Sequence, residues 1–375
     1  MKKTTLFMCA VLMSIAAGVA QTVSTFTDGT PDDGIAIDTD GNVYASNFTG
    51  DSVFKFDTNG NATPFVSGLN TPNGLAFDND GNLYVCDFSA QTIFKFDSDG
   101  NQLDAFAVAG NPSGIIKMPT GDDLVYTIFS NSSIHRLTPD GTMTPISSDS
   151  QLNGPVGLAY DENGTLFTGN YNNREIYRIE ANGDATYIAQ LPTDGGPLPN
   201  LGFITYGQGR LWGTTMGSDK IFSVNPNGID DFTLFAGSSQ GSTDGDISVA
   251  TFNTPNGILF NDAEDTMYIT DFGSKNLRII SGVALGVNEN NFNRAHVSMA
   301  PVPAFDQLEI RISGWASNSV QVQVFDLSGS FLFSSELHPD GPSAQGSIDV
   351  SALPQGTYFV RLRDGKDSIT RKFVK

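Results

Sequence analysis

The stretch Pro72-Asn73-Gly74-Leu75-Ala76-Phe77-Asp78-Asn79-Asp80-Gly81-Asn82-Leu83-Tyr84 returns, with changes, along most of the chain. An earlier copy reads Asp32-Asp33-Gly34-Ile35-Ala36-Ile37-Asp38-Thr39-Asp40-Gly41-Asn42-Val43-Tyr44. The first glycine recurs at intervals of 40, 40, 43, 45 and 55 residues, at Gly34, Gly74, Gly114, Gly157, Gly202 and Gly257. A second glycine follows seven positions later in the first five copies. A period of this length indicates a repeat architecture.

Each copy reads as four short strands. In the first copy an apolar strand over 35–37 leads through Asp40-Gly41, a turn in which glycine accepts positive φ, into a second strand over 43–46. A third strand over 53–56 alternates in polarity, and an outer strand over 63–66 follows Asn59-Gly60. Four-stranded units of about 40 residues are typical of propeller blades. The sequence therefore predicts an all-β chain with a six-bladed β-propeller over residues 21–285.

The sixth copy lacks a fourth strand, because the pattern stops at Gly282. The segment 22–29, which precedes the first copy, is similar to outer strands such as 62–68. We predict that this N-terminal strand completes blade six. Such a closure removes the free edges of the ring.

The N-terminus has the pattern of a secretory signal peptide over residues 1–20. Lys2 and Lys3 precede an apolar run over 6–17, and the small residues of 18–20 suit cleavage before Gln21. The run is shorter than the roughly 18 residues of a membrane-spanning helix. We therefore expect no transmembrane segment in the mature chain. Cleavage would leave Cys86 as the one cysteine, so no internal disulfide is expected.

Charge separates the chain into two parts. Residues 21–285 contain 10 Lys and Arg against 32 Asp and Glu, whereas residues 286–375 contain 8 against 9. So acidic a propeller argues against nucleic acid or an anionic membrane as a partner. It is compatible with cation binding and equally with plain solubility outside the cell.

The second part, residues 286–375, is predicted to be a small immunoglobulin-like β-sandwich, because it contains several short alternating strands such as 320–327. Three of its stretches, 324–329, 353–358 and 371–375, resemble the type A sorting domain of the bacterial type IX secretion system. The resemblance assigns the sorting signal to Gly329, Gly356, Arg371 and Lys372. It implies the type IX machinery as a partner, Sec export to the periplasm, and a final location outside the cell or on the outer membrane. An ordinary immunoglobulin-like accessory module is the alternative.

The propeller copies resemble NHL-type repeats, best seen in 250–258 and 267–271, and the wider gluconolactonase-like superfamily. Propellers of this kind usually bind ligands where the loops before the repeat glycines meet the channel. The residues at that position are Asp33, Asn73, Ser113, Val156, Leu201 and Asn256. We take Asp33, Asn73, Ser113 and Asn256 as candidate ligand-binding residues.

Related lactonases hold a divalent cation at this place with Glu, Asn and Asp, and use it as a Lewis acid. The resemblance therefore makes Asp33, Asn73 and Asn256 candidate ligands of Ca²⁺ or another divalent cation, with Asp32 and Asp33 in place of the glutamate. Val156 and Leu201 cannot ligate through their side chains and break the expected set. No catalytic residue can be named from the sequence.

Two further positions repeat at the ends of the second strands. Asn47, Asp87, Asn170 and Asp271 are expected to accept hydrogen bonds from loop N–H groups. The aromatic residues that follow these positions either line a binding face for sugar or peptide or pack between blades; they are Phe48, Phe88, Tyr171 and Phe272.

The leading functional hypothesis is a secreted or cell-surface propeller that binds an unknown extracellular ligand or protein without catalysis. The rival is a divalent-metal-dependent lactonase or esterase, and a structural spacer is a third reading. Metal analysis combined with a lactone hydrolysis screen separates the first two. A channel plugged by side chains favours the third.

Overall fold

The computed structural model describes residues 21–194, 199–283, 296–300, 304–313, 320–326, 331–337, 343–363 and 368–375. The chain divides into two compact units, Met1–Leu285 and Gly286–Lys375. The expected signal peptide lies outside the described residues. Within these described ranges, no helix has the length and hydropathy needed to cross a membrane.

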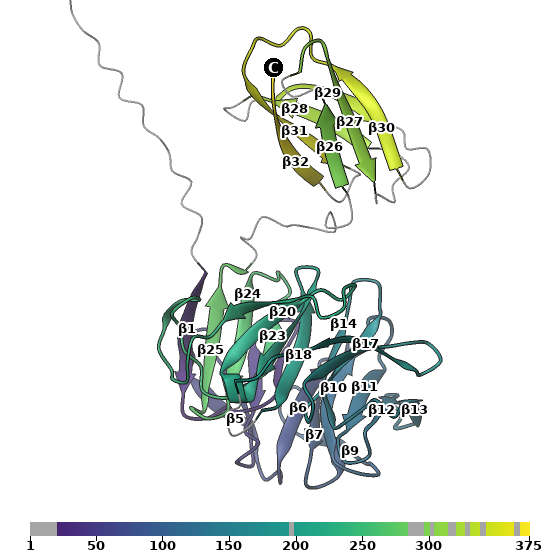
Figure 1. Ribbon diagram of the computed structural model, residues 1–375. Coiled ribbons are helices and arrows are strands. Elements are labelled where there is room, and N and C mark those ends of the chain that lie inside the picture. The colour runs from purple at the N-terminus through teal and green to yellow at the C-terminus, as the bar shows by residue number, and fades with distance from the viewer. Residues whose placement is uncertain are drawn as a thin grey trace, which may run out of the picture. The chain divides into compact units, whose positions relative to one another are not determined.

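The first unit is a ring of six antiparallel sheets, which confirms the predicted propeller (Figure 1). Blade one contains β2(Ile35–Ile37), β3(Val43–Ser46), β4(Val53–Phe56) and β5(Ala62–Val66). Blade two contains β6(Pro72–Phe77), β7(Leu83–Asp87), β8(Thr92–Phe96) and β9(Gln102–Ala107). Blade three contains β10(Pro112–Lys117), β11(Leu124–Ile128), β12(Ser133–Leu137) and β13(Met143–Ser147).

Blades four and five follow the same order. Blade four contains β14(Pro155–Tyr160), β15(Leu166–Asn170), β16(Glu175–Ile179) and β17(Ala185–Gln190). Blade five contains β18(Leu201–Gly207), β19(Arg210–Thr215), β20(Lys220–Val224) and β21(Phe232–Ala236), with a 3₁₀ turn η1(Met216–Ser218) after β19.

Blade six is built from both ends of the first unit, as the sequence predicts. Its sheet has the order β22-β1-β25-β24-β23 and contains β1(Thr22–Asp28), β22(Gly245–Asp246), β23(Pro255–Phe260), β24(Thr266–Asp271) and β25(Asn276–Ser281). β1 runs antiparallel to β25, from Thr22 opposite Ser281 to Asp28 opposite Asn276. The short β22, which the repeat pattern does not reveal, covers the outer edge of β1.

Apolar clusters lie between neighbouring blades rather than within one sheet. Tyr44 and Val53 of blade one, for example, pack with Leu75, Leu83 and Val85 of blade two. Five further clusters of the described residues join the other pairs of neighbouring blades around the ring. Each blade is therefore stabilised by the two blades beside it, and the ring depends on its closure.

The repeat glycine is required by the close approach of the inner strands around the channel. A Cβ added to Gly74 would lie 2.3 Å from the carbonyl oxygen of Ser113, and one on Gly114 would lie 1.8 Å from that of Val156. Gly257 meets the carbonyl oxygen of Asp33 at 2.1 Å in the same way. These distances exclude any side chain, because real Cβ atoms do not approach oxygen so closely.

Blade five departs from the register that the repeat predicts. Leu201 pairs with Thr215 as Pro112 pairs with Ile128 in blade three. Leu201 is therefore equivalent to Pro112, which stands two residues before the repeat glycine Gly114. Gly202 therefore occupies the position expected for Leu201, and Phe203 stands where the other blades have their repeat glycine. Leu201 itself is fully buried in the core between blades four and five.

The cause of the offset is a hairpin that is one residue shorter. Gly207 pairs with Arg210, which leaves a two-residue turn of Gln208 and Gly209, with φ of 55° and 72°. Positive φ at both positions is the mark of a type I′ turn. Aligning the second glycines, as the sequence invites, shifts the whole inner strand by one residue.

The second unit is a β-sandwich. One sheet has the order β26-β27-β30, with β26(His296–Ala300), β27(Gln307–Ser313) and β30(Ser343–Asp349). The other has the order β29-β28-β31-β32, with β29(Phe331–Leu337), β28(Val320–Phe325), β31(Thr357–Arg363) and β32(Ser368–Val374). Buried residues of both sheets, including Ile310, Val322, Ile348 and Val360, form its core.

The expected sorting residues occupy different environments in this unit. Gly356 exchanges two backbone hydrogen bonds with Lys375, at 2.9 and 3.0 Å. Arg371 is exposed in β32, and Lys372 belongs to the same strand. Gly329 lies outside the described residues.

Candidate functional site

One end of the propeller channel holds a cavity of about 370 Å³ that all six blades line. Its residues come from two positions of the repeat, namely the starts of the inner strands and the ends of the second strands. The lining residues are Asp33, Phe48, Asn73, Phe88, Ser113, Phe129, Val156, Tyr171, Phe203, Met216, Asn256 and Phe272.

Four of these residues form what we call the polar floor: Asp33, Asn73, Ser113 and Asn256. All four are buried, with at most 6% of each side chain exposed. Hydroxyl groups of the second strands hold their backbones, since Ser46 Oγ donates to the carbonyl oxygen of Asn73 at 2.6 Å and Thr270 Oγ1 to that of Asp33 at 2.6 Å. The structure thus brings together the four candidate ligand-binding residues and holds them firmly.

Asp33 is the electrostatic centre of the floor. Burial raises the pKa of its carboxyl well above the ordinary value, and the neighbouring charge of Asp32 raises it further. Asn256 Nδ2 donates to Asp33 Oδ1 at 3.1 Å and opposes the shift. Burial, followed by the charge of Asp33, also raises the pKa of Tyr171. Ionisation of Asp33 at this buried position is therefore costly.

Asn73 presents an unsatisfied acceptor. Its side chain is 5% exposed, and its Oδ1 atom is buried without a hydrogen-bond partner. Leaving such an acceptor unpaired costs about 1–3 kcal/mol. Buried polar groups of this kind call for an explanation, and a bound ligand that donates to them is one.

Above the floor lies a ring of side chains that we call the collar, with one member from each blade: Phe48, Phe88, Phe129, Tyr171, Met216 and Phe272. Adjacent aromatic rings are in contact, with centroids 5.8 Å apart for Phe48 and Phe88 and 5.7 Å apart for Phe88 and Phe129. The ring contacts of Phe48 with Phe272 and of Phe129 with Tyr171 continue the series.

The repeat pattern predicted four members of the collar and missed Phe129 and Met216. Both stand directly after a second strand, as Phe88, Tyr171 and Phe272 do, and Phe48 follows its second strand after one residue. The signal was present in the sequence, because the position recurs in every blade.

Some of the residues expected to accept hydrogen bonds from loop N–H groups do so. Asp87 accepts from the backbone N–H groups of Asn70, Thr71 and Ala90. In blade one, Asp32 has this role: its carboxylate accepts hydrogen bonds from Phe48 N at 2.5 Å and from Thr49 N at 3.3 Å. Asp32 is therefore engaged by a loop and does not face the cavity as a second ligand beside Asp33.

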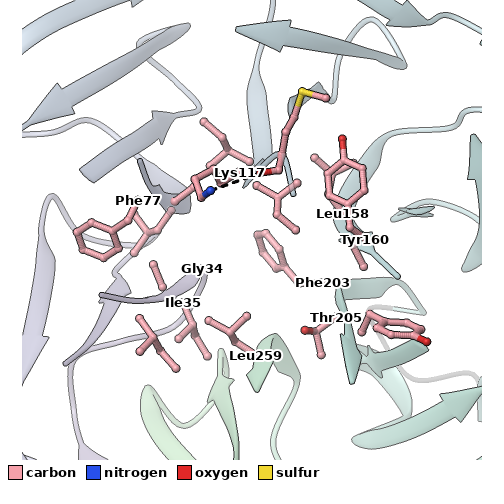
Figure 2. Close-up of a pocket in the computed structure, with 18 of the residues that line it drawn as sticks. Gly34, Ile35, Phe77, Lys117, Leu158, Tyr160, Phe203, Thr205 and Leu259 are labelled. Atoms are coloured by element: carbon pink, nitrogen blue, oxygen red, sulfur yellow. Dashed lines mark hydrogen bonds between the residues drawn. The ribbon is translucent and has the colours of Figure 1, made fainter. Parts of the chain in front are cut away.

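Phe203 separates this cavity from a larger one of about 600 Å³, lined by the inner strands toward the opposite end of the channel. Figure 2 shows the ring of Phe203 projecting into the middle of that larger cavity, among Ile35, Leu158 and Leu259. Phe203 thus divides the channel into two cavities and does not fill it, so the channel is not one plugged throughout by side chains.

The larger cavity offers little polar chemistry. Its walls are mainly aliphatic, and its carboxylates are already bonded: Asp78 takes Asn82 and Lys95, and Asp161 takes the N–H groups of Asn163 and Thr165. Lys117 Nζ donates to the carbonyl oxygen of Met118 at 3.5 Å. Among the described residues, one buried polar atom without a partner, Asn73 Oδ1, belongs to the lining of the smaller cavity and none to that of the larger. The smaller cavity also holds the buried carboxyl of Asp33, and it is therefore the candidate site.

The floor does not fit a resident divalent cation. Ca²⁺ takes six to eight oxygen ligands, whereas the floor contributes one carboxylate, from Asp33, and the side chains of Asn73, Ser113 and Asn256. Asn256 turns its Nδ2 toward Asp33, and blades four and five contribute Val156 and Phe203. No group of three or more His, Cys, Asp or Glu side chains suited to a metal occurs among the residues that the structure describes.

Asp33→Asn is expected to raise thermal stability, and the gain should grow with pH. The pKa of folded Asp33 lies above its unfolded value, so wild-type stability falls as pH rises from about 4 through the folded pKa. Asparagine keeps an acceptor for Asn256 and carries no charge. A gain of about 1 kcal/mol or more near pH 8, vanishing near pH 4, should be seen in thermal melts.

Asp57→Asn is the matched control with the opposite sign. The side chain and backbone N–H of Asn61 lower the pKa of exposed Asp57, so its replacement should reduce stability above pH 4. Equal effects of the two substitutions at every pH would contradict the environment described for Asp33.

Two family profiles match the chain. One, described as the virginiamycin B lyase family, matches residues 14–251, which is more than half of the chain. The other, a secretion system C-terminal sorting domain, matches residues 298–375. The protein is therefore handled by the type IX secretion machinery and exported to the cell surface or beyond it. No curated protein matches.

Solved structures share the propeller fold at low sequence identity. A catalytically inactive His-to-Ala virginiamycin B lyase from Staphylococcus aureus, with quinupristin, has 18% identity and a TM-score of 0.52, over 70% of this chain and 99% of its own. A Xanthomonas campestris gluconolactonase has 18% identity and a TM-score of 0.55, over 70% and 89%. An auxiliary nutrient binding protein from Bacteroides thetaiotaomicron has 15% identity and a TM-score of 0.60, over 70% and 76%.

Proposed function

This chain belongs to the virginiamycin B lyase family, but we propose that its smaller cavity binds a small ligand and does not transform it. The protein would then be a binding propeller on the cell surface or outside the cell. The observation that carries this proposal is the buried carboxyl of Asp33, which forms no ion pair among the described residues, beside the unpartnered Oδ1 of Asn73 and beneath an aromatic collar. The NHL-type repeat and the signal peptide remain predictions.

Lyase chemistry lacks support from the residues of the site. The Staphylococcus enzyme is catalytically inactive when one histidine is replaced by alanine, but no histidine is among the residues that line this cavity. His135 lies in β12, within 2.9 Å of Ser133 Oγ and stacked on Tyr126. His296 belongs to the second unit, and His338 lies outside the described residues.

Metal-dependent lactone hydrolysis also lacks support, since the floor does not fit a divalent cation. The cavity is instead built as binding pockets are, with a volume in the usual range of about 300–1,000 Å³, mainly apolar walls and a few convergent polar groups. The similarity in fold to a nutrient binding protein agrees with this reading.

The test compares binding and turnover on the same purified chain. Thermal shift against a panel of small molecules should give stabilising compounds, and Phe88→Ala in the collar should weaken their binding about tenfold, a loss of about 1.4 kcal/mol. Phe305→Ala is the control, because Phe305 is 75% exposed in the second unit. We expect no hydrolysis of lactones and no cleavage of streptogramins.

Two results would overturn the proposal. One is stoichiometric divalent metal together with lactonase activity that Asp33→Ala or Asn256→Ala abolishes. The other is a set of stabilising compounds whose binding is unchanged by Phe88→Ala, which would place their site elsewhere.

A further inference from the structure

Resting on the proposed function, we propose that the ligand of the smaller cavity is a small organic ammonium, with its charged N–H group on the polar floor and an apolar substituent inside the collar. The inference concerns the class of ligand and goes beyond binding as such. Charge, hydrogen bonding and the collar each support it separately.

The charge of the floor has no counterion. Asp33 is 3% exposed and forms no ion pair among the described residues, whereas its neighbour Asp32 lies 3.8 Å from Lys275 Nζ. The propeller around it is strongly acidic, with 10 Lys and Arg against 32 Asp and Glu. A cation in the cavity would pair with Asp33, while an anion would meet a carboxylate in an acidic protein.

The polar floor presents hydrogen-bond acceptors, so a matching ligand carries donors. Asn73 Oδ1 is an acceptor without a partner, and Asp33 accepts one bond from Asn256. An alkylammonium carries up to three N–H donors on a single charged atom. It therefore carries enough donors for both Asp33 and Asn73, whereas a ligand with one hydroxyl group carries a single donor.

The collar suits the rest of such a ligand. Five half-buried aromatic rings and Met216 surround the space above the floor. Aromatic faces attract organic cations and also pack against apolar groups. Ca²⁺ would gain little from these side chains, since the four phenylalanine rings carry no ligand atom and the thioether of Met216 is a soft ligand that a hard cation does not favour.

The experiment is calorimetric titration of the full chain with four probes. Phenethylammonium carries the proposed features, 2-phenylethanol replaces the ammonium by a neutral hydroxyl, phenylacetate reverses the charge, and CaCl₂ tests the metal. We expect phenethylammonium to bind at least about tenfold more tightly than the alcohol. Phenylacetate and Ca²⁺ should not bind measurably.

Variants identify the floor as the place of binding. Asp33→Asn should weaken phenethylammonium binding about tenfold or more while leaving binding of 2-phenylethanol nearly unchanged, because only the charge is removed. Asn73→Ala should weaken the ammonium severalfold. Asp57→Asn, a distant exposed aspartate, is the control, and melting temperatures verify that each variant is folded.

The failures of the two proposals look different. Equal affinity for the ammonium and the alcohol, both weakened by Phe88→Ala, would overturn the ammonium class and keep the binding function. No binding of phenethylammonium at about 10 mM, well above a millimolar dissociation constant, would also overturn it. Stoichiometric Ca²⁺ binding that Asp33→Asn abolishes would overturn both proposals.

Discussion

A chain that starts at residue 30, and so lacks β1, should melt about 10 °C or more below the chain that starts at residue 21. β1 is the strand that joins the two ends of the ring. Without it, β25 becomes an open edge, and β22 has no strand to pair with.

The expected loss follows from what β1 contacts. Val23 is 2% exposed in the cluster between blades five and six, and Phe26 contacts the rings of Phe56 and Tyr268. Burying side chains of this size contributes about 1.5–3 kcal/mol each. The backbone of β1 pairs with β25 along six residue positions, and Asp244 accepts from Thr25 N and Thr25 Oγ1.

A matched pair of substitutions separates closure from a general effect of truncation. Val23→Asp puts a charge into the buried seam and should lower the melting temperature strongly, whereas Val249→Asp changes a valine that is 58% exposed and should have little effect. A synthetic peptide of residues 21–29 should restore part of the stability of the truncated chain, and a scrambled peptide should not. Unchanged melting of the truncated chain, or of Val23→Asp, would contradict the closure.

The second large effect is expected from Arg278→Met, which should destabilise the propeller by about 3–5 kcal/mol at neutral pH. Arg278 is fully buried in β25. Its guanidinium forms ion pairs with the carboxylates of Asp271, at 3.3 Å, and Asp244, at 2.7 Å. It also donates to the carbonyl oxygens of Thr243 and Thr251. Methionine can fill much of the space but leaves these acceptors unpaired.

The deficit should depend on pH in a defined direction. Burial raises the pKa of Asp271 to about 7 even though the charge of Arg278 opposes the shift. Without Arg278 the folded pKa rises further, so the penalty of ionised Asp271 grows as pH increases and largely disappears near pH 4. Denaturant unfolding at pH 4.5 and 7.5 measures the difference.

Two controls accompany this variant. Arg178→Met removes a half-exposed pair with Glu180 in blade four and should cost about 1 kcal/mol or less. The double variant Arg278→Met/Asp271→Asn removes the orphaned carboxyl and should recover much of the loss at pH 7.5. A similar cost for Arg278→Met and Arg178→Met would contradict the role of the buried pair.

The fold could be predicted because two glycines recur along the chain, and each is required for a different physical reason. Gly41 and Gly81 have φ of 82° and 80° in their turns, whereas Gly74 and Gly114 are required by backbone approach between blades. The register of blade five was predicted wrongly because its hairpin is one residue shorter. Gly202 and Gly209 keep the seven-residue spacing of the two repeat glycines, although Phe203 occupies the position of the first. A one-residue error in the alignment of a strand reverses the predicted direction of every side chain in it.

The candidate site was predicted in part. The position before the repeat glycine led to Asp33, Asn73, Ser113 and Asn256, because strands that converge on one axis bring equivalent residues together. What each side chain does there was hidden from the sequence. Asp32 and Asp33 are adjacent, yet a loop engages one and the other is left without a counterion.

The closure of blade six also sets an order of events for folding. β1 leaves the ribosome or the export channel first, but β25 follows some 250 residues later, and such distant contacts form slowly. Until then β1 is an unpaired strand that another molecule can capture. We therefore expect pairing of β1 with β25 to be a late step of folding, and exchange of β1 between two incompletely folded chains to be the misfolding event that this closure favours.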